Sequence, residues 1–283
     1  MQFSTRLFAP RPLAAYALPL PLAASTALTV ALALAAGSAR AQFVEEVPFI
    51  TSPDNVTLEM LRIAEVGPTD HLIDLGSGDG RIVITAAHRF GATGLGVEIV
   101  PELVQKSLRS ARHAGVAGKV DFRVQDLFKT DLSRATVVTM YLLPEFNMLL
   151  RPSLLQLPPG TRVVSHDWDM GDWQPDETRT LQVPDKQVGL QKSSKVHLWV
   201  VPAQVAGQWC GTGTWTGARL QLTQRFQMVE GTLQRGATAQ PVQVRLRGTS
   251  LPLPGAAPVQ VAGDTLRSPG GAFTRAGASG CPA

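Results

Sequence analysis

A glycine-rich string at positions 74–80 combines glycines and carboxylates in a spacing that is typical of a ligand-binding loop. It reads Asp74-Leu75-Gly76-Ser77-Gly78-Asp79-Gly80. Glycines in such a loop let the backbone turn tightly and approach a ligand closely. The spacing is G-x-G-x-G, whereas a dinucleotide-binding loop has G-x-G-x-x-G, with the pyrophosphate on a helix N-terminus. Carboxylates at Asp74 and Asp79 would repel a pyrophosphate, so the loop favours a cationic ligand that carries an amino group.

Two further acids follow the next predicted strands, at positions that suit a nucleoside. Glu98 lies at the end of the strand after the loop, 24 residues beyond Asp74. A carboxylate at that strand end can accept hydrogen bonds from both ribose hydroxyls. Asp126 follows the third strand and is placed to accept an adenine amino group. The three acids together predict an adenosyl ligand.

The elements that must position these residues alternate between strand and helix. Strands are predicted at 71–75, 94–99, 120–124, 135–143, 161–165 and 195–201, and helices at 52–65, 81–90, 101–113 and 145–155. The first helix is predicted to have Ser52 as its cap and Pro53 at its first position. Strands alternating with helices are typical of a parallel, doubly wound sheet. The fold class is therefore α/β, with a Rossmann-like domain over residues 42–202.

These strings resemble class I S-adenosylmethionine-dependent methyltransferases over roughly residues 50–202. More narrowly, they are similar to the mitochondrial lysine methyltransferases that modify the adenine nucleotide translocase and the ATP synthase c subunit. The resemblance is carried by residues 74–83, 96–99, 126–128, 137–144 and 159–165. It implies a seven-stranded methyltransferase sheet, S-adenosyl-L-methionine as the cofactor and a protein lysine as the methyl acceptor.

The resemblance also implies a cofactor-binding set. The methionine end of the cofactor would lie against the loop after the first strand, the ribose against the acid after the second, and the adenine beside the residues after the third. The set is Asp74, Gly76, Ser77, Gly78, Asp79, Gly80, Glu98, Asp126 and Leu127.

The predicted catalytic residues follow the fourth and fifth strands. Tyr141 and Glu145 lie where this fold presents its substrate side, and Asp167 comes next, between His166 and Asp169. A lysine nucleophile must first lose a proton, which costs about 4–5 kcal/mol at a pH of about 7. Desolvation of the amine would lower this cost. The alternatives are a buried strand aromatic at Tyr141, a solvated first-turn acid at Glu145, and a purely loop-shaping role for His166 and Asp167.

The first 41 residues form a segment of unusual composition. They contain three arginines and no acid, and residues 13–37 carry no charge. Followed by Ala39-Arg40-Ala41, these are the parts of a cleavable signal peptide, which predicts a periplasmic or secreted protein. If residues 13–37 stay uncleaved, they are long enough to act as an inner-membrane anchor. An acid-free, Arg-bearing start also fits a mitochondrial transit peptide.

Charge is unevenly distributed along the rest of the chain. Beyond residue 41 there are 23 basic and 22 acidic residues, a balance that is not typical of a nucleic-acid-binding protein. Residues 42–202 hold 16 basic and 20 acidic residues, whereas residues 203–283 hold seven arginines, no lysine and two acids. This shift near Pro202 predicts a domain boundary.

Residues 203–283 are predicted to form a small antiparallel β domain. Leu220 and Leu222 alternate with polar neighbours, and Gly, Pro and Ser separate such runs. From about Pro252 the chain is rich in Gly, Ala and Pro, and we expect this tail to be loosely ordered. The domain contains no catalytic motif, so a lid, a docking surface and a stabilising extension all remain open as its role.

Cys210 and Cys281 are the two cysteines of the chain. Two cysteines are too few for a multi-cysteine zinc cluster, and no group of His, Cys and acids has metal-ligand spacing. If the protein is exported, it folds where disulfides persist. We therefore expect a bridge that ties the tail to the first strand of the small domain. The alternative is two unrelated thiols.

Three functions fit the sequence. The first is methyl transfer to a protein lysine, and the second is methyl transfer to a small molecule. The third is a binding module that keeps the fold and senses an adenosyl ligand without turnover. The third is favoured by compartment, because S-adenosylmethionine is made in the cytosol and an exported enzyme would need a supply of it.

Overall fold

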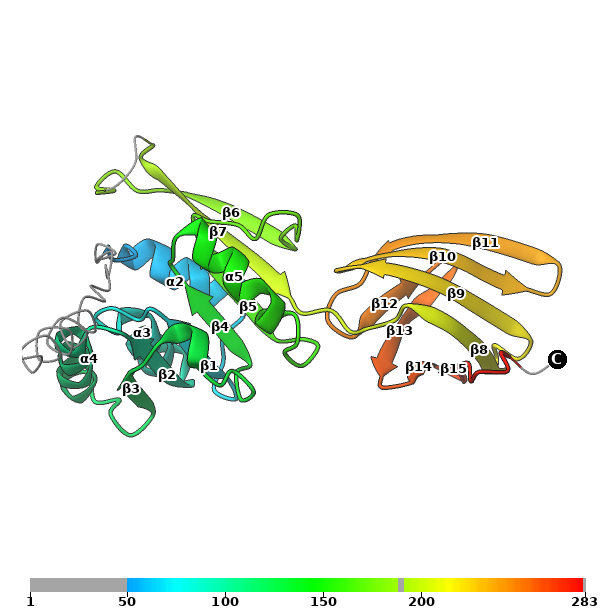
Figure 1. The fold of residues 1–283 in the computed structure, drawn as a ribbon, viewed down its shortest axis with the longest axis horizontal. Coiled ribbons are helices and arrows are strands. Elements are labelled where there is room, and N and C mark those ends of the chain that lie inside the picture. Colours follow the sequence, from blue (N-terminus) through cyan, green and yellow to red (C-terminus); the bar gives the residue numbers. More distant parts are fainter. Residues whose placement is uncertain (1–49, 188–190, 282–283) are drawn as a thin grey trace, which may run out of the picture. The chain divides into compact units, whose positions relative to one another are not determined.

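The computed structural model describes residues 50–187 and 191–281. The first part of this range forms a sheet flanked by helices (Figure 1). Its helices are α2 (Asp54–Ile63), α3 (Arg81–Phe90), α4 (Pro101–His113) and α5 (Pro144–Leu154), with a 3₁₀ turn η1 (Leu127–Lys129). Its strands are β1 (His71–Leu75), β2 (Thr93–Glu98), β3 (Val120–Val124), β4 (Val137–Met140), β5 (Arg162–His166), β6 (Glu177–Gln182) and β7 (Ser193–Val200).

The first sheet has seven strands in the order β3-β2-β1-β4-β5-β7-β6, which confirms the predicted seven-stranded α/β sheet. Five strands are parallel, so Leu72 of β1 pairs with Gly94 on one side and Val137 on the other. The predicted parallel pairing holds for these five strands, whereas β7 runs antiparallel to β5 and β6 runs antiparallel to β7. Among the described residues, no helix lies between β5 and β6 or between β6 and β7 along the chain, and connections without a crossover join antiparallel strands.

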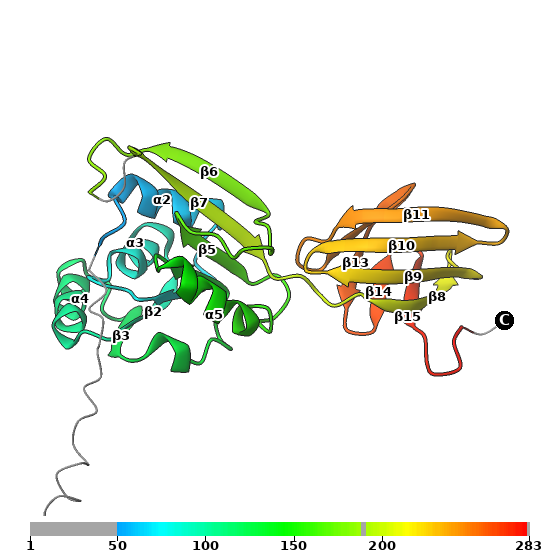
Figure 2. The same ribbon diagram turned by 45° about the horizontal axis from the view of Figure 1, so that its top comes forward.

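Helices cover both faces of this sheet (Figure 2). Helices α2, α3 and α4 pack on one face, where Val83 belongs to the same buried cluster as Leu72. Helix α5 packs on the other face, where Leu154 shares a cluster with Ile73. Leu72 and Ile73 serve different cores because successive strand residues point to opposite faces. The carboxyl ends of the parallel strands are left free at one edge, where this kind of sheet binds its ligands.

Helix α2 begins at Asp54, and Pro53 caps it without a side-chain hydrogen bond. The prediction that Ser52 caps this helix is wrong. The Ser52 hydroxyl lies 2.8 Å from Nδ1 of His166 instead. Both residues are buried, and a buried imidazole needs hydrogen-bond partners. The partner 114 positions away has therefore displaced the local cap.

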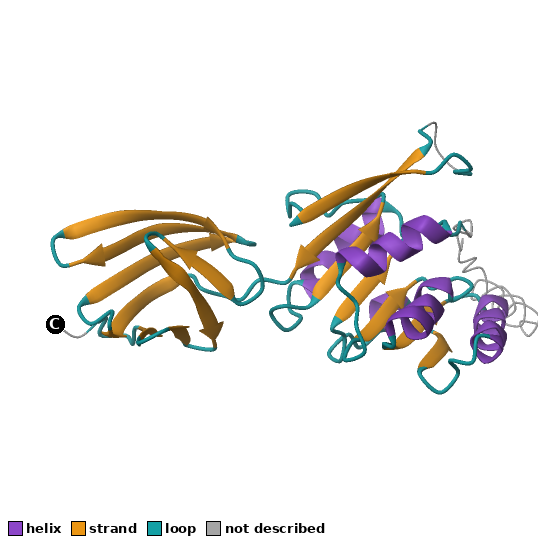
Figure 3. Ribbon diagram, turned by 180° about the vertical axis from the view of Figure 1, so that it is seen from behind, coloured by secondary structure: helices purple, strands orange, loops and turns teal. Residues whose placement is uncertain are grey.

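The second sheet is built only of strands, in contrast to the first (Figure 3). Its strands are β8 (Gly207–Gly213), β9 (Ala218–Arg225), β10 (Met228–Arg235), β11 (Thr238–Arg245), β12 (Ser250–Leu253), β13 (Ala256–Ala262), β14 (Thr265–Ser268) and β15 (Gly271–Arg275). They pair antiparallel in the order β11-β10-β9-β8-β15-β14-β13-β12, and the end strands β11 and β12 lie in contact. The predicted small antiparallel β domain is confirmed, as a sheet curled into a near-barrel.

The interior of the near-barrel is filled with apolar side chains. Trp209 and Leu220 are fully buried there, and so are Val259, Leu266 and Phe273 from the last three strands. The expectation of a loosely ordered tail beyond Pro252 is therefore wrong. Its turns hold Pro254, Gly255, Gly263, Pro269 and Gly270, while alternating apolar residues in the strands between them face the core.

A disulfide joins Cys210 of β8 to Cys281, which confirms the predicted pairing. The Cα atoms are 5.4 Å apart, and the two residues are 71 positions apart in the chain. The bridge fastens the segment after β15 to β8, with which β15 also pairs through Thr274 and Cys210.

The predicted signal peptide or anchor, residues 1–41, lies outside the described residues. Within the described part, no helix combines the length and the apolarity needed to cross a membrane. The boundary predicted near Pro202 falls between β7 and β8, the last strand of one sheet and the first of the next.

Candidate active site

The glycine loop after β1 turns the chain sharply into α3. Gly76, Gly78 and Gly80 have φ angles of 74°, 54° and 79°, a left-handed region that favours glycine. The amides of Gly76 and Ser77 both donate to the carbonyl oxygen of Val97 in β2. The loop is therefore held across the carboxyl ends of β1 and β2, with its backbone open to a ligand.

Asp74 lies at the floor of this loop and is 2% exposed. The Thr139 hydroxyl of β4 donates to its Oδ1 at 2.7 Å. Burial, reinforced by the nearby charges of Glu98 and Asp79, raises the pKa of Asp74 to about 7. A cation placed against this carboxylate would therefore be strongly favoured, because its charge would offset both the desolvation cost of the buried carboxylate and the repulsion from the neighbouring carboxylates.

A narrow cleft opens at the loop. It is lined by Ile50, Thr51, Ser52, Asp74, Gly76, Ser77, Gly78, Asp79, Arg81, Ile82 and Tyr141. Asp79 is already engaged there, because Nε and Nη2 of Arg81 donate to its two carboxylate oxygens at 2.9 and 2.8 Å. Burial of Asp79 opposes its ionisation, but Arg81 and Lys106 hold its pKa below the usual value. The negative charge of Asp79 is therefore compensated within the protein, whereas that of Asp74 is not compensated enough to offset its burial.

Glu98 is held at the carboxyl end of β2. Its carboxylate accepts hydrogen bonds from the amides of Gly78, Ile99 and Val100 at 3.0, 2.8 and 3.1 Å. Glu98 therefore tethers the glycine loop to the end of β2. It does not line the cleft, and its predicted contact with a ribose stays a prediction.

Asp126 and Leu127 lie after β3. The Asp126 carboxylate caps η1 by accepting from the Phe128 amide at 2.9 Å. Near these residues, Ile99 and Phe128 are 63% and 46% exposed, although both are large apolar side chains. Exposed apolar side chains after the ends of β2 and β3 suit a flat base. Neither residue was predicted from the sequence as a site candidate, although both lie in the strings that carried the resemblance.

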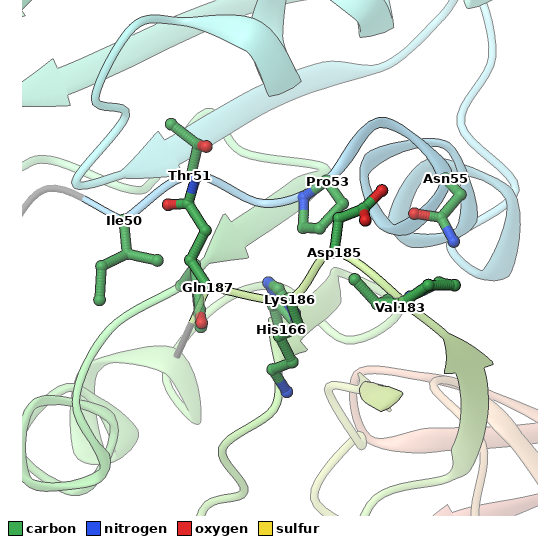
Figure 4. A pocket seen from close by; sticks show the side chains of 11 residues that line it. Ile50, Thr51, Pro53, Asn55, His166, Val183, Asp185, Lys186 and Gln187 are labelled. Carbon is green, nitrogen blue, oxygen red and sulfur yellow. The ribbon is translucent and has the colours of Figure 1, made fainter. Parts of the chain in front are cut away.

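A second cavity, of about 380 Å³, shares lining residues with the cleft, and Figure 4 shows this cavity from close by. It is lined by Ile50, Thr51, Pro53, Asn55, Tyr141, His166, Val183, Pro184, Asp185, Lys186 and Gln187. Ile50, Thr51 and Tyr141 line both spaces. A group bound in the cleft and a group bound in this cavity would therefore meet beside Tyr141.

Tyr141 stacks on His166, with 3.9 Å between the ring centroids. The imidazole is 1% exposed and has a serine hydroxyl at each nitrogen, Ser52 at 2.8 Å and Ser194 at 2.9 Å. Burial and the charge of Lys186 lower the pKa of His166 to about 4. The imidazole is therefore neutral near physiological pH, and it supports the Tyr141 ring without adding a charge to the cavity.

Asp167 follows His166 with a φ angle of 64°, which is unusual for a residue other than glycine. This turn lets its Oδ1 accept from the Lys195 amide at 2.9 Å. Its Oδ2 lies 2.7 Å from Nζ of Lys186 and 3.5 Å from Nε2 of His166. Asp167 is thus a partly buried carboxylate in contact with Lys186 and close to His166, two residues that line the second cavity, and its catalytic role stays a prediction.

Asn147 of α5 is a residue of the site region that the sequence analysis missed. It is fully buried, and its amide donates to Ser165 Oγ and to the carbonyl oxygens of Trp168 and Asp169. These bonds anchor the segment that carries Asp167. A buried amide on a helix has no sequence signal of its own, so only the fold reveals this role.

The other predicted catalytic candidates lie elsewhere. Glu145 is exposed in the first turn of α5 and lines neither space. Asp169 is also exposed, and its carboxylate accepts from the Gly171 amide at 3.0 Å. Trp173, which follows this segment, is fully buried against Trp199 and is a packing residue.

A doubly wound sheet with the strand order 3-2-1-4-5-7-6 and a glycine loop after β1, where Asp74 and Glu98 end adjacent strands, defines the class I S-adenosylmethionine-dependent methyltransferases. The chain is a protein of this class. Its family follows from its similarity to known proteins.

Residues 74–177 match the family described as the ANTKMT methyltransferase domain. A protein-lysine N-methyltransferase of Saccharolobus islandicus is 40% identical over 161 residues, which are 56% of this chain and 96% of that protein. The adenine nucleotide translocase lysine N-methyltransferase of Mus musculus is 35% identical over 51% of this chain and 63% of its own length. The chain therefore belongs to the ANTKMT family.

One solved structure is similar at both sequence and fold level. It is described as an RNA methyltransferase from Salinibacter ruber in complex with S-adenosyl-L-homocysteine, the demethylated form of the cofactor. It is 51% identical, with a TM-score of 0.50, and the match covers 55% of this chain and 96% of that one. These matches cover little more than half of the chain, so they do not account for its carboxyl-terminal near-barrel.

S-adenosylmethionine is the cofactor of this chain, and the residues present fit it. Asp74 offers a buried carboxylate that lacks a cation, which suits the methionine amino group. Ile99 and Phe128 offer uncovered apolar surface for the base. When bound, the cofactor supplies a methyl group that its sulfonium has already activated. The chain's own task is then to align an acceptor with that methyl group.

Proposed function

We propose that this chain transfers a methyl group from S-adenosylmethionine to the ε-amino group of a lysine in a protein. The observation that carries the proposal is the cavity of about 380 Å³ that meets the cofactor cleft at Tyr141. The relatives from Saccharolobus islandicus and Mus musculus, both described as lysine N-methyltransferases, support a lysine as its occupant.

The residues around this cavity suit an amine. A carboxylate, Asp167, can receive the ammonium form, and Tyr141 with its neutral partner His166 provides an uncharged wall. Partial burial of the amine lowers its pKa and so eases loss of the proton. The deprotonated nitrogen then forms the new N–C bond with its lone pair. The C–S bond breaks, its electron pair stays on sulfur, and a second proton leaves the nitrogen.

We further propose that the mature protein works outside the cytosol. The amino-terminal segment has the composition of a signal peptide. The Cys210–Cys281 bridge supports the same compartment, because disulfides persist in oxidising environments. The substrate would then be a protein of the cell envelope or one that passes through it.

RNA is the second candidate substrate, because the Salinibacter ruber structure is described as an RNA methyltransferase. The seven arginines and two acids of residues 203–283 would favour a polyanion. Residues 42–202 hold more acids than basic residues, however, and the ammonium of Lys186, which lines the cavity, is already paired with Asp167. A protein lysine therefore has the stronger support.

The test is a methyl-transfer assay on a cell-envelope fraction and on total RNA, each from a strain that lacks this gene. Purified protein and radiolabelled S-adenosylmethionine are added, and each product is divided for protease or ribonuclease treatment. We expect label in protein, recovered as methyl-lysine after hydrolysis. A Gly78→Val variant, which blocks the cofactor loop, serves as the inactive control. Label that enters only RNA would contradict the proposal.

A further inference from the structure

An ion pair joins Lys186, which lines the second cavity, to Asp167. Nζ of Lys186 is 2.7 Å from Oδ2 of Asp167, and it also donates to the carbonyl oxygen of Ser193 at 2.7 Å. The side chains of Lys186 and Asp167 are only 14% and 16% exposed. This is a buried lysine ammonium with two well-placed acceptors, in a protein for which a lysine is the proposed substrate.

The Lys186 ammonium lies in the cavity that we propose for the substrate lysine. Of the lysines that the structure describes, Lys186 is the one that lines either the cofactor cleft or the second cavity. In the close-up view it lies beside His166, on which Tyr141 stacks (Figure 4). The Lys186 head group therefore occupies the same cavity that a substrate lysine must enter.

One carboxylate contacts the Lys186 ammonium. Asp167 supplies this negative charge, and His166 adds none because burial keeps it neutral. Asp185 also lines the cavity, but it is exposed to solvent. A second ammonium next to the first would face an uncompensated like charge in a partly buried site. A substrate lysine and Lys186 therefore compete for one carboxylate.

We propose that Asp167 is the carboxylate that receives the substrate's ammonium group, and that Lys186 occupies this position in the free enzyme until the substrate displaces it. The inference rests on the proposed function, which it deepens. It makes Asp167 the residue that selects a lysine, and it makes Lys186 an internal competitor that disfavours free amines. A protein substrate can displace Lys186 because its contacts outside the cavity contribute additional binding energy.

A small amine acceptor tests the competition directly. Nα-acetyl-lysine methylamide carries the lysine side chain without a protein around it. With S-adenosylmethionine present, we expect Lys186→Ala to methylate this probe with a kcat/KM at least about tenfold above that of the wild type, mainly through a lower KM. Adding Asp167→Asn to Lys186→Ala should abolish the gain.

Lys192 provides the matched control. It lies near Lys186 in the chain, and its exposed side chain donates to the Lys186 carbonyl oxygen. Lys192→Ala should methylate the probe at the wild-type rate. Lys186→Met, which retains the length of the side chain but lacks the charge, covers the case in which Lys186→Ala does not fold.

A second readout does not depend on turnover. Pulse acetylation with excess reagent, followed by mass spectrometry, measures how accessible each lysine is. We expect slow labelling of Lys186 and fast labelling of Lys192 in the free protein. Saturation with the Nε,Nε-dimethylated form of the probe, whose tertiary amine keeps its positive charge when protonated but forms no stable amide with the reagent, should accelerate labelling at Lys186 alone.

Two results would overturn the inference. One is a folded Lys186→Ala variant that methylates the probe no faster than the wild type. The other is a Lys186 labelling rate that the dimethylated probe does not change. Either would make the ion pair a structural support for the Asp167 loop. Failure of the proposed function would look different, because the wild type itself would then label no envelope protein.

Discussion

The Tyr141 ring lies against the His166 imidazole with 29° between the ring planes, at the junction of the cofactor cleft and the second cavity. Ser52 and Ser194 fix the imidazole from both sides. Tyr141, which follows β4, is thus held beside the proposed methyl acceptor by His166 of β5, and His166 is held by Ser52 before α2 and Ser194 of β7.

Replacing Tyr141 by Phe tests whether the Tyr141 hydroxyl contributes to methyl transfer. The ring would keep its stacking, but the hydroxyl that can contact an amine would be lost. We expect methyl transfer to slow by at least about tenfold, or about 1.4 kcal/mol in the barrier, with S-adenosylmethionine affinity almost unchanged. Glu145→Gln is the matched control. Because Glu145 is exposed and lines neither space, its removal should leave the rate near that of the wild type.

Removing the His166 support should act through Tyr141. In His166→Leu the two serine hydroxyls would lose their partner, and the ring below Tyr141 would disappear. We expect KM for the protein substrate to rise, while His166→Gln, which keeps hydrogen-bonding groups, recovers part of the loss. Equal kinetics for Leu and Gln would show that hydrogen bonds to this residue do not position Tyr141.

Two buried groups predict opposite pH dependences of stability. The pKa of His166 is lowered from 6.5 to about 4, so its contribution to the free energy of unfolding is present above pH 6.5 and is lost as pH falls towards 4. The pKa of Asp74 is raised from 3.8 to about 7, so its contribution to the free energy of unfolding is present below pH 3.8 and is lost as pH rises towards 7. In the wild type, between a pH of about 4 and about 6.5, the two pH dependences of stability therefore oppose each other.

Asp74→Asn should remove the contribution of Asp74 to the pH dependence of stability and leave that of His166. The variant keeps an oxygen that can accept from Thr139. We expect its free energy of unfolding to rise more steeply with pH than that of the wild type between a pH of about 4 and about 6.5. Thermal unfolding across this range measures the effect. Parallel curves for the two proteins would contradict the raised pKa of Asp74.

Loss of the disulfide should destabilise the near-barrel. Cys210 and Cys281 are 71 positions apart, and the chain-entropy model assigns a loop of this length a stabilisation of about 4 kcal/mol. We expect Cys281→Ser to lower the unfolding temperature of the exported protein. Cofactor affinity should remain unchanged, because neither cysteine lines the cofactor cleft. Two free thiols in mature protein recovered from outside the cytosol would contradict the bridge.

The glycine loop and the strands around it could be predicted from sequence because their signals are local. Gly76, Gly78 and Gly80 need left-handed backbone, and β1 is a short apolar run that ends at them. Strand β6 was not predicted, because most of its residues are exposed and it lacks an apolar pattern. It forms by pairing with β7, a tertiary interaction.

The missed features of the site all depend on distant partners. The Ser52 hydroxyl serves His166 rather than its own helix, and Asn147 anchors a segment about 20 residues away. Lys186 is one of several lysines in the sequence, and nothing local distinguishes it from Lys192. Its partner Asp167 was predicted, but the pairing follows only from the fold.

We propose that this protein methylates lysines of envelope proteins in the cell. Mass spectrometry of envelope proteins from the wild-type and deletion strains measures this methylation directly. A deletion strain complemented with the Gly78→Val variant controls for loss of the protein itself. The account predicts methylated lysines in the wild type that are unmodified in both other strains. Identical lysine methylation in all three strains, with a methylated RNA lost from the deletion strain, would contradict it.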